Sequence, residues 1–320
     1  MKNSVVEKPI VVSVIGAGNM AKEHIRAFSN IDDVIVSGIY SRTRCKSEEL
    51  AKMFDIDNVC DSIEDLYLTT QADIVIIAVS ELSVYKVCLD SFIYSWLCLI
   101  EKPAGFTFLQ AKAIKDKAEK LGARAYVALN RRHYGSTREV IKELEKVEGD
   151  RLVHIYDQEN PIAALEAGCS EEVVKNWMYA NSIHVVDFFR MFGRGAVTSI
   201  QPIIRWSPDN PKFVMAKIVF SSGDIGIYEC IWNGPGPWAV TVTTQQKRWE
   251  MRPLEKATVQ NYKSRKLELL PESAWDSKFK PGLRLQAEET IRALRMEGTL
   301  LPTLAESMET MKIIKSIYEI

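Results

Sequence analysis

One stretch of the sequence, IVVSVIGAGNMA at residues 10–21, restricts the possible folds of this chain more than any other. Its first six residues are mostly β-branched, which is the composition of a buried parallel strand. The strand pattern stops at Gly16, and a helical pattern then runs from Asn19 to Phe28. The order of strand, tight turn and helix predicts the first unit of an α/β fold with a parallel sheet.

The turn carries the pattern G-x-G-x-x-A, in which Ala21 stands where a third glycine is common. Gly16 permits the sharp turn, Gly18 leaves no side chain between the backbone and a diphosphate, and Ala21 lets the helix lie close to the strand. The phosphates would lie at Asn19 and Met20, where the unpaired N–H groups and the dipole of the helix favour negative charge. We therefore expect a dinucleotide to bind here; the alternative is a glycine turn in an ordinary strand–helix unit.

Length, charge and composition argue against several other classes of protein. The chain has 320 residues, which is too many for one small core and suits two domains. A net charge of −1 gives no reason to expect binding to nucleic acid or to an anionic membrane. The longest apolar runs, such as residues 92–100, are too short to span a membrane, and residues 1–9 lack the apolar core of a signal peptide.

The cysteines and histidines indicate neither a disulfide framework nor a metal site. The four histidines are scattered, and no two of the six cysteines form a C-x-x-C pair. Most of the cysteines lie in apolar patterns, so we expect buried thiols in the reducing cytoplasm. The six are Cys45, Cys60, Cys88, Cys98, Cys169 and Cys230.

Strand and helix patterns continue to alternate as far as residue 129. Such alternation predicts a parallel sheet, whose ligands gather at the carboxyl ends of the strands. Strands are predicted at residues 34–40, 72–79, 96–100 and 125–129. Helices are predicted at 48–54, from Ser62 onward, at 84–92, and at 109–121 with a stop at Gly122. The strand ends carry residues 16–21, 41–44, Ser80 and Glu81, 101–103, and 130–132.

The residues after the second strand bear on the choice of cofactor. A carboxylate about 20 residues past the glycines binds the ribose 2′-hydroxyl of NAD. This chain has Ser41, Arg42, Thr43 and Arg44 there, which offer hydroxyl and guanidinium groups. Because arginine forms a bidentate fork with phosphate oxygens, the sequence favours NADP over NAD. The alternative is that Arg42 only stacks on the adenine, which serves either cofactor.

A Glu-Lys-Pro run, residues 101–103, follows a later strand of the predicted sheet. Pro103 pushes Lys102 toward an extended backbone, so the lysine has a defined direction at the mouth of the sheet. A lysine over a nicotinamide can share a proton with a substrate hydroxyl, and burial lowers its pKa toward the working range. The alternative is a solvated lysine in a surface loop. The cofactor-binding residues expected along this edge are Ser80, Glu101, Lys102 and Asn130.

Three features together resemble the Gfo/Idh/MocA oxidoreductases over nearly the whole chain. They are the glycine turn with His24 in its helix, the Glu-Lys-Pro run, and Asn130-Arg131-Arg132 followed by an aromatic residue. The resemblance implies an N-terminal Rossmann domain, here residues 1–125. It also implies a C-terminal α+β domain, residues 126–320, with a large, mainly antiparallel open sheet. The implied reaction is NAD(P)-linked oxidation or reduction at a secondary alcohol carbon of a sugar, sugar nucleotide or cyclic polyol.

The second half of the chain reads as short strands with polar turns between them, which favours an antiparallel sheet. Strands are predicted at 152–156, 197–206, 213–221, 224–231, 238–244 and 248–252. Residues 255–280 are predicted to form a loop and edge region, and residues 303–320 an amphipathic helix. Trp206, Trp232, Trp238 and Trp249 indicate that one face of the sheet is covered. In the family such a face commonly packs on another subunit, which implies a homodimer or homotetramer; the alternative is packing on the domain's own helices.

Residues 176–193 resemble the family's active-site helix, which carries His184 and, three residues on, Asp187. A histidine suits proton exchange with a substrate hydroxyl, whereas we expect Asp187 to cap a helix or pair with a basic group. Many family members have an Asp four residues before the His, but this chain has Ala180. Asn181 is the nearest polar substitute, and an amide cannot take up a proton as a carboxylate can. Either Lys102 and His184 carry the proton transfer between them, or Asn181 only holds a substrate hydroxyl.

The sequence thus predicts a cytoplasmic NADP- or NAD-dependent oxidoreductase with Lys102 and His184 as its catalytic residues. Arg131 and Asn181 join them as candidates for substrate binding. One alternative is a glycosidase or lyase that keeps the dinucleotide bound and oxidises its substrate transiently. Another, suggested by Ala180, is a dinucleotide-responsive binding protein that has lost the chemistry. Neither the substrate nor the direction of the reaction can be inferred from the sequence.

Overall fold

In the computed structural model, which describes residues 8–320, the opening stretch forms strand β1 (Ile10–Ile15), the glycine turn and helix α1 (Asn19–Phe28), as predicted. β1 lies inside a six-stranded parallel sheet with the order β3-β2-β1-β4-β5-β6. The strand order reverses between β1 and β4, which is where ligands bind in open parallel sheets. The other strands are β2 (Val34–Tyr40), β3 (Asn58–Cys60), β4 (Ile74–Ile77), β5 (Leu97–Glu101) and β6 (Ala125–Ala128).

Both faces of this sheet are covered, because successive residues of its strands are buried on opposite sides. Ile74 and Ile76 of β4 pack in one apolar cluster with residues of α1. Val75 and Ile77 pack in the other cluster, with residues of the later helices. These later helices are α3 (Ile63–Thr70), α4 (Glu81–Ser91) and α5 (Phe108–Leu121), whereas the buried residues of α2 (Arg44–Phe54) lie in the first cluster with α1. The fold of this half is therefore the predicted doubly wound α/β arrangement.

The helix ends in this half follow local sequence signals. The Ser62 hydroxyl accepts a hydrogen bond from the Asp65 N–H at the start of α3, and Gly122 ends α5 in the left-handed conformation. Both predicted end signals are therefore confirmed. Helices α2 and α4 begin earlier than predicted, because polar residues fill their first turns and the apolar pattern does not mark them. Strand β3, which is only three residues long, was not predicted.

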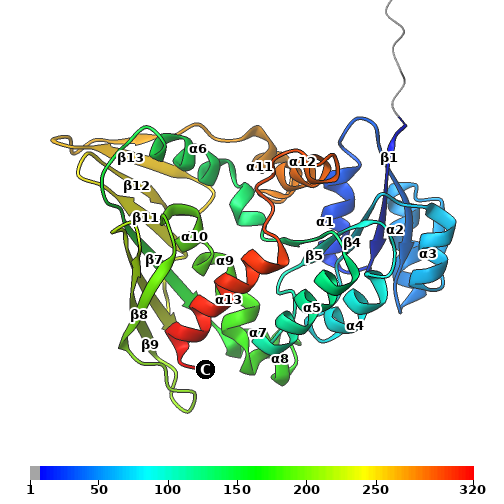
Figure 1. Ribbon diagram of the computed structural model, residues 1–320, viewed down its shortest axis with the longest axis horizontal. Coiled ribbons are helices and arrows are strands. Elements are labelled where there is room, and N and C mark those ends of the chain that lie inside the picture. Colours follow the sequence, from blue (N-terminus) through cyan, green and yellow to red (C-terminus); the bar gives the residue numbers. More distant parts are fainter. Residues whose placement is uncertain (1–7) are drawn as a thin grey trace, which may run out of the picture.

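The second half contains an eight-stranded sheet with the order β14-β13-β12-β11-β7-β10-β9-β8 (Figure 1). All neighbouring strands are antiparallel except β7 and β10, so the prediction of a mainly antiparallel sheet is confirmed. The strands are β7 (Leu152–Glu159), β8 (Val197–Ile204), β9 (Phe213–Phe220), β10 (Ile225–Trp232), β11 (Ala239–Thr243), β12 (Lys247–Met251), β13 (Ala257–Asn261) and β14 (Leu267–Leu269).

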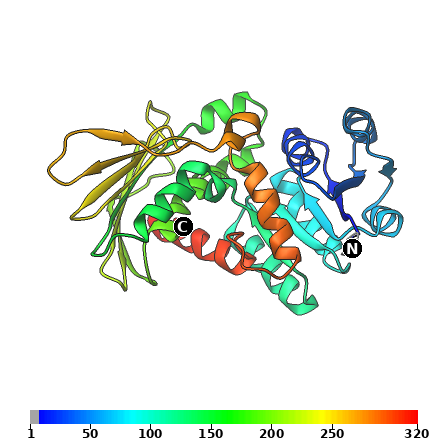
Figure 2. The same ribbon diagram turned by 90° about the horizontal axis from the view of Figure 1, so that it is seen from above.

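The helices of this half lie on one side of the second sheet (Figure 2). The prediction of a loop and edge region at residues 255–280 was only partly right, because this segment holds β13, the edge strand β14 and a short helix. The helices are α6 (Gly135–Leu144), α7 (Pro161–Glu166), α8 (Glu171–Lys175), α9 (Ile183–Val186), α10 (Phe188–Phe192), α11 (Ala274–Lys278), α12 (Leu283–Leu294) and α13 (Leu304–Tyr318). A 3₁₀ turn, η1 (Asn130–His133), precedes α6, and a π-helical turn, η2 (Met178–Ser182), precedes α9.

The tryptophans of the second sheet face its own helices. Trp206 and Trp232 lie 5.7 Å apart between ring centroids, and Tyr318 of α13 lies 5.7 and 5.9 Å from them. Trp249 is fully buried, and the indole N–H of Trp238 donates to the Gln158 carbonyl. Of the two explanations for these tryptophans, packing within the domain is the one that the structure shows.

The C-terminal helices return to the first sheet. Helix α12, for which no prediction was made, packs on α1, and α13 packs on α5. The Val127 N–H of β6 donates to the Pro302 carbonyl at 2.9 Å, just before α13 begins. These contacts join the two halves of the chain. The division into domains at residue 125 stays a prediction.

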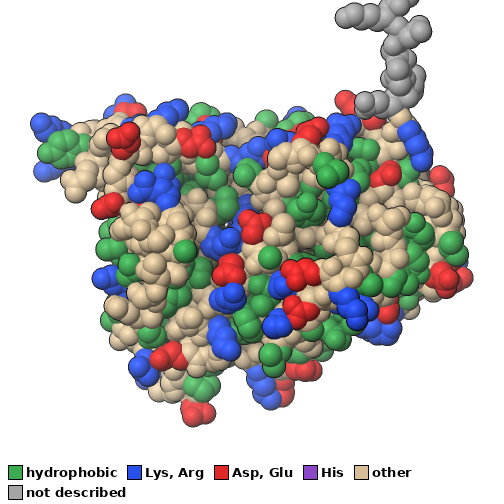
Figure 3. Space-filling model, in the orientation of Figure 1, with side chains coloured by type: hydrophobic (Ala, Val, Ile, Leu, Met, Phe, Trp, Pro, Cys, Tyr) green, Lys and Arg blue, Asp and Glu red, His purple; other side chains and the backbone are tan. Residues whose placement is uncertain are grey.

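The surface and the cysteines add two observations. On the face drawn in Figure 3, acidic and basic side chains are intermixed. No helix in the described part of the chain is long and apolar enough to cross a bilayer. Four of the cysteines are buried free thiols, as expected, whereas Cys45 and Cys169 are exposed. The expectation for residues 1–9 falls almost wholly outside the described residues.

Asp187 joins three parts of the fold. Its carboxylate accepts two hydrogen bonds from the Arg132 guanidinium of η1, at 2.5 and 2.8 Å, and one from the Thr310 hydroxyl of α13 at 2.8 Å. Asp187 and Arg132 are both buried. A buried carboxylate in such a network holds the joined segments firmly, and this is the structural role expected for Asp187.

We predict that Asp187→Ala lowers the free energy of unfolding by about 3–5 kcal/mol, because the change leaves the buried Arg132 charge uncompensated. Urea unfolding at 25 °C measures this. The control is Asp209→Ala at an exposed position, for which we expect a change within about 0.5 kcal/mol. Equal effects of the two substitutions would show that the buried network contributes nothing beyond an ordinary surface contact.

Candidate functional site

A pocket of about 490 Å³ opens at the carboxyl edge of the first sheet, where the strand order reverses. It brings together five of the predicted cofactor residues, namely Gly16, Gly18, Ser41, Arg42 and Ser80. Gly16 has a φ of +116°, and a Cβ there would lie 2.1 Å from the Ala78 carbonyl oxygen, so only glycine fits. No atom lies within 4 Å of a Cβ built at Gly18, which leaves its backbone open to a ligand.

The two arginines that the sequence places after the second strand, Arg42 and Arg44, differ in whether acidic residues pair with them. Arg44 is engaged by Glu48 and Asp61, whereas Arg42 is exposed and lines the pocket. Lys46 lines it too, which the sequence analysis missed. It lies four residues after Arg42 in the first turn of α2, and that spacing could have indicated it. The one acidic residue among those that line the pocket is Asp90, which pairs with Lys86 at 2.6 Å.

The other predicted cofactor residues lie outside this pocket. Asn19 is exposed at the start of α1, and the Met20 sulfur lies 3.2 Å from the Lys280 amine, which reaches across from the second half of the chain. The buried Glu101 carboxylate lies 2.6 Å from His24 Nε2. The Asn130 amide donates to the Pro281 carbonyl at 3.0 Å. Glu101 and Asn130 therefore hold neighbouring segments together, whatever else they contact.

Lys102 follows β5 and points toward the π-helical turn. Its amine donates a hydrogen bond to the Ala180 carbonyl at 2.8 Å, and the side chain is half-buried. Burial lowers the pKa of Lys102, and the nearby charge of Arg131 lowers it further. The acidic residues Glu101, Glu81 and Glu159 act in the opposite direction without cancelling the effect of burial. The amine is thus held in place and made easier to deprotonate.

The predicted helix at 176–193 is broken into η2, α9 and α10. Single π-helical turns recur at functional sites. His184 lies in α9, half-buried, and its Nδ1 has no hydrogen-bond partner among the described residues. Burial holds the pKa of His184 well below its usual value, and the charges of Lys102, Arg131 and Lys280 add to the shift. His184 is therefore a neutral imidazole at neutral pH and can accept a proton.

A buried carboxyl group lies behind the π-helical turn. Glu159, at the end of β7, has no exposed surface and accepts hydrogen bonds from Asn181 Nδ2 at 2.8 Å and Ser182 Oγ at 2.6 Å. Burial raises its pKa well above the usual value, as does the neighbouring Asp157. A carboxyl group thus contacts the segment in which Ala180 replaces the expected Asp. It belongs to strand β7, whereas the expected Asp would have been part of the helical segment itself.

The sequence analysis missed this acidic pair, although a signal was present. Asp157 and Glu159 alternate with half-buried positions in β7 and share a face with the apolar Val153 and Ile155. Two acids in register with core residues indicate buried carboxyl groups. Asp157 accepts a hydrogen bond from the Tyr228 hydroxyl at 2.7 Å, and burial raises its pKa. The pair lies beneath the turn that faces Lys102.

The two substrate-binding candidates differ in their surroundings. The Asn181 amide N–H is already engaged by Glu159. Arg131 is buried, its guanidinium carbon lies 4.0 Å from the centre of the Trp238 ring, and its Nη1 has no partner among the described residues. Trp238 was predicted only as one of the tryptophans on a covered face of the second sheet. Lys102, His184 and Arg131 lie near enough to one another that the charge of Arg131 lowers the pKa of Lys102, and the charges of both lower the pKa of His184.

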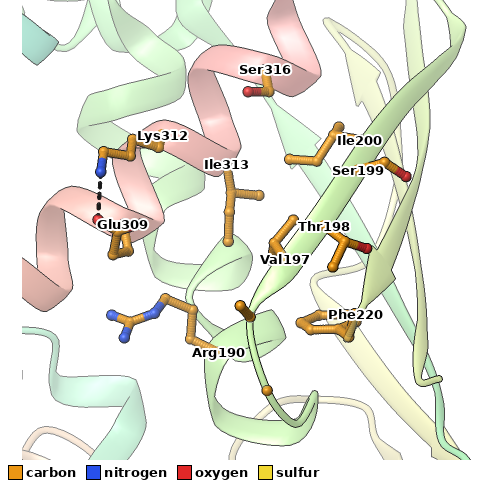
Figure 4. Close-up of a pocket in the computed structure, with 12 residues that line it drawn as sticks. Arg190, Val197, Thr198, Ser199, Ile200, Phe220, Glu309, Lys312, Ile313 and Ser316 are labelled. Carbon is orange, nitrogen blue, oxygen red and sulfur yellow. Dashed lines mark hydrogen bonds and ion pairs between the residues drawn. The ribbon is translucent and has the colours of Figure 1, made fainter. Parts of the chain in front are cut away.

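Another pocket, of about 540 Å³, lies between β8, α10 and α13 and holds none of the predicted site residues (Figure 4). Val197, Ile200, Phe220 and Ile313 give it an apolar wall. The Lys312 amine, paired with Glu309 at 2.6 Å, lies on its helical side. It shares no residue with the pocket at the glycine turn.

The parallel sheet, its glycine turn and the pocket at the strand reversal define a dinucleotide-binding protein with a second, mainly antiparallel sheet. A family described as an oxidoreductase family with an NAD-binding Rossmann fold matches residues 10–129. The resemblance to the Gfo/Idh/MocA oxidoreductases that the motifs indicated is thereby confirmed over residues 10–129.

One curated relative matches part of this chain. A stretch of 128 residues is 28% identical to glucose-6-phosphate 3-dehydrogenase from Bacillus subtilis (strain 168). The match covers 38% of this chain and 34% of the relative, which is about a third of its length.

Solved structures resemble the whole chain. One is a putative NADPH-dependent oxidoreductase from Desulfitobacterium hafniense, with a TM-score of 0.81, 16% identity and coverage of 96% of this chain and 94% of that one. A levoglucosan dehydrogenase in complex with NADH and levoglucosan has a TM-score of 0.79, 16% identity and coverage of 97% and 96%. The UDP-N-acetylglucosamine 3-dehydrogenase of Acidithiobacillus ferrooxidans has a TM-score of 0.77, 12% identity and coverage of 97% of both chains. At these identities the likeness shows the shared fold.

We predict that Arg42→Ala weakens binding of NADP at least tenfold, about 1.4 kcal/mol, while NAD affinity changes less than threefold. The reason is that Arg42 lines the pocket without a described partner and would face a 2′-phosphate. Fluorescence titration with NADPH and NADH measures both affinities. Arg44→Ala is the matched control, since Arg44 is already paired with Glu48 and Asp61. Equal losses for the two cofactors would mean that Arg42 merely stacks on adenine.

Proposed function

We propose that this protein is an NAD(P)-dependent oxidoreductase that moves a hydride to or from a secondary alcohol carbon of a sugar, sugar nucleotide or cyclic polyol. The observation that carries the proposal is the approach of Lys102 and His184, two proton-exchanging groups with lowered pKa values, beside the edge of the sheet that bears the glycine turn. The names of the similar proteins, which include dehydrogenases of sugars and a sugar nucleotide, support the substrate class.

The residues of the first domain fit a pyridine dinucleotide. Gly16 and Gly18 leave room for a diphosphate at the N-terminus of α1, with Asn19 and Met20 beside it. Ser41 and Arg42 would contact the adenosine end, and the free guanidinium favours NADP. When bound, the nicotinamide would supply the hydride acceptor or donor. Ser80, Glu101 and Asn130 remain further candidates for contact with it.

Lys102 and His184 would handle the proton of the reacting oxygen. In the oxidation of an alcohol, the carbon-bound hydrogen leaves as a hydride and the hydroxyl proton passes to the free base of Lys102 or to the neutral His184 ring. In the reverse direction the same groups return the proton. The hydrogen bond from Lys102 to the Ala180 carbonyl fixes the amine, so a substrate oxygen would meet it in one orientation.

Glu159 would support the site without exchanging the proton itself. Both of its carboxyl oxygens are occupied by Asn181 and Ser182, and the group is closed off from solvent. By holding the residues that follow Ala180, it fixes the carbonyl that receives the Lys102 amine. This supports proton transfer by Lys102 and His184 in place of the missing Asp. The carbonyl oxygen of the Asn181 amide is left for a substrate hydroxyl.

We also propose that the protein is a cytoplasmic homodimer or homotetramer. Within residues 8–320, no helix covers the outer face of the second sheet, and apolar side chains such as Ile204 and Phe213 are exposed, at 44% and 56%. Uncovered apolar patches mark interaction surfaces. The free cysteines suit a reducing compartment.

We predict that Lys102→Met lowers turnover by about 10²–10⁴-fold, because the substrate oxygen loses its proton partner, and leaves cofactor affinity within a few-fold. The assay follows reduced cofactor while the protein is mixed with NADP or NAD and a panel of sugars and sugar nucleotides. Lys120→Met, at an exposed position of α5, is the control. An unchanged rate in Lys102→Met would remove Lys102 from the mechanism.

In the same assay of the wild-type protein, product formed without net reduced cofactor would favour the glycosidase or lyase alternative. Cofactor binding without any product would favour the alternative of a binding protein.

The pH dependence of oxidation should follow the free base of Lys102. Because burial lowers the pKa of Lys102, kcat/KM for oxidation should rise with pH through an apparent pKa below 10.5. His184 is already neutral at neutral pH, so we expect no limb near its ordinary value of 6.5. Initial rates across a pH series, at saturating cofactor, measure the profile. A rising limb at the ordinary lysine value would contradict burial of the amine in the working enzyme.

A further inference from the structure

Arg131 is held in place, yet one of its donors is unused. Its side chain is only 8% exposed, and its guanidinium carbon lies 4.0 Å from the centre of the Trp238 ring. That ring is itself fixed by a hydrogen bond of 2.9 Å from its N–H to the Gln158 carbonyl. Nη1 of Arg131 is buried and has no hydrogen-bond partner in the described part of the chain. A buried donor left unpaired is costly, and functional sites are where such groups are retained.

The charges around the site leave Arg131 without a close counter-ion. Lys102, Arg131 and Lys280 all lower the pKa of His184, and no acidic residue in the described part of the chain is found to raise it. Lys102 is held by the Ala180 carbonyl, and Lys280 lies against Met20 at the start of α1, where a cofactor diphosphate would bind. Neither lysine can serve as a counter-ion of Arg131, because an amine carries no negative charge.

The nearest acidic side chains do not neutralise Arg131. Asp157 and Glu255 act on it only as charges at a distance. Asp157 accepts its hydrogen bonds from the Tyr228 hydroxyl and the Gln158 N–H. The Tyr134 hydroxyl lies beside the guanidinium but carries no charge. Burying a guanidinium without a paired carboxylate is unfavourable, and an anion arriving with the substrate would relieve the cost.

We propose that the substrate carries an anionic group, a phosphate or a carboxylate, and that Arg131, whose guanidinium lies over the Trp238 ring, binds it. This inference rests on the proposed function and narrows its substrate class to acidic sugars, sugar phosphates or sugar nucleotides. A guanidinium matches two oxygens of either anion with parallel N–H donors. The charge of Arg131 lowers the pKa values of Lys102 and His184, so the three side chains lie near one another. The anionic group and the reacting hydroxyl would therefore belong to one small molecule.

The test is isothermal titration of the protein saturated with NADP, so that anions cannot enter the cofactor pocket. The probes are glucose, glucose 6-phosphate, glucuronate and UDP-glucose, which separate a phosphate monoester, a carboxylate and a nucleotide diphosphate from a neutral sugar. We expect at least one of the three anions to bind the wild-type protein tenfold or more tightly than glucose. Equal or tighter binding of glucose than of all three would overturn the proposal, and this comparison needs no variant.

Variants then assign the effect to Arg131. Arg131→Met should weaken the favoured anion at least tenfold, and Arg131→Lys should weaken it less because the charge remains. NADPH affinity should stay within threefold in both. Arg205→Met is the control, since Arg205 is exposed and pairs with Glu319. Full anion affinity in Arg131→Met would overturn the assignment. Failure of the wild-type protein to bind either cofactor would instead refute the proposed function, whereas turnover of neutral sugars alone would refute only this inference.

Discussion

The hydrogen bond from Lys102 to the Ala180 carbonyl is the contact on which the rest of the site depends. It connects the end of β5, in the parallel sheet, with the π-helical turn that lies against the antiparallel sheet. An amine withdrawn from water requires such a partner, and the carbonyl can serve only if the turn is fixed. Glu159 fixes it from below through Asn181 and Ser182. The site therefore exists only where the two halves of the chain meet.

Burial at that meeting point also sets the charge of each group. It favours the neutral forms of Lys102, of His184 and of the Glu159 carboxyl group. Arg131 keeps its positive charge, because a guanidinium does not lose its proton in a protein. One fixed positive charge thus remains among groups that burial has made neutral or easier to neutralise. Under the proposed function, this asymmetry would allow one site both to exchange protons and to attract an anion.

Local signals in the sequence were enough for most of the first half of the chain. The strand, glycine turn and helix at residues 10–28 were predicted with their bounds, and the caps at Ser62 and Gly122 were confirmed, because short-range geometry decides such features. Glu159 and the Arg131–Trp238 stack were not predicted as parts of a site, because they depend on which strand lies behind which turn. Helix α12 was missed for a similar reason, since its packing on α1 comes from a distant part of the chain.

The most direct test of this account is a crystal structure of the protein with NADP and a bound anionic sugar. We expect the diphosphate at the turn of Gly16 and Gly18, and a substrate oxygen at hydrogen-bond distance, about 2.6–3.2 Å, from the Lys102 amine, with its carbon beside the nicotinamide. A nicotinamide ring bound away from Lys102, or a Lys102 amine turned away from both the Ala180 carbonyl and the substrate, would contradict the central claim.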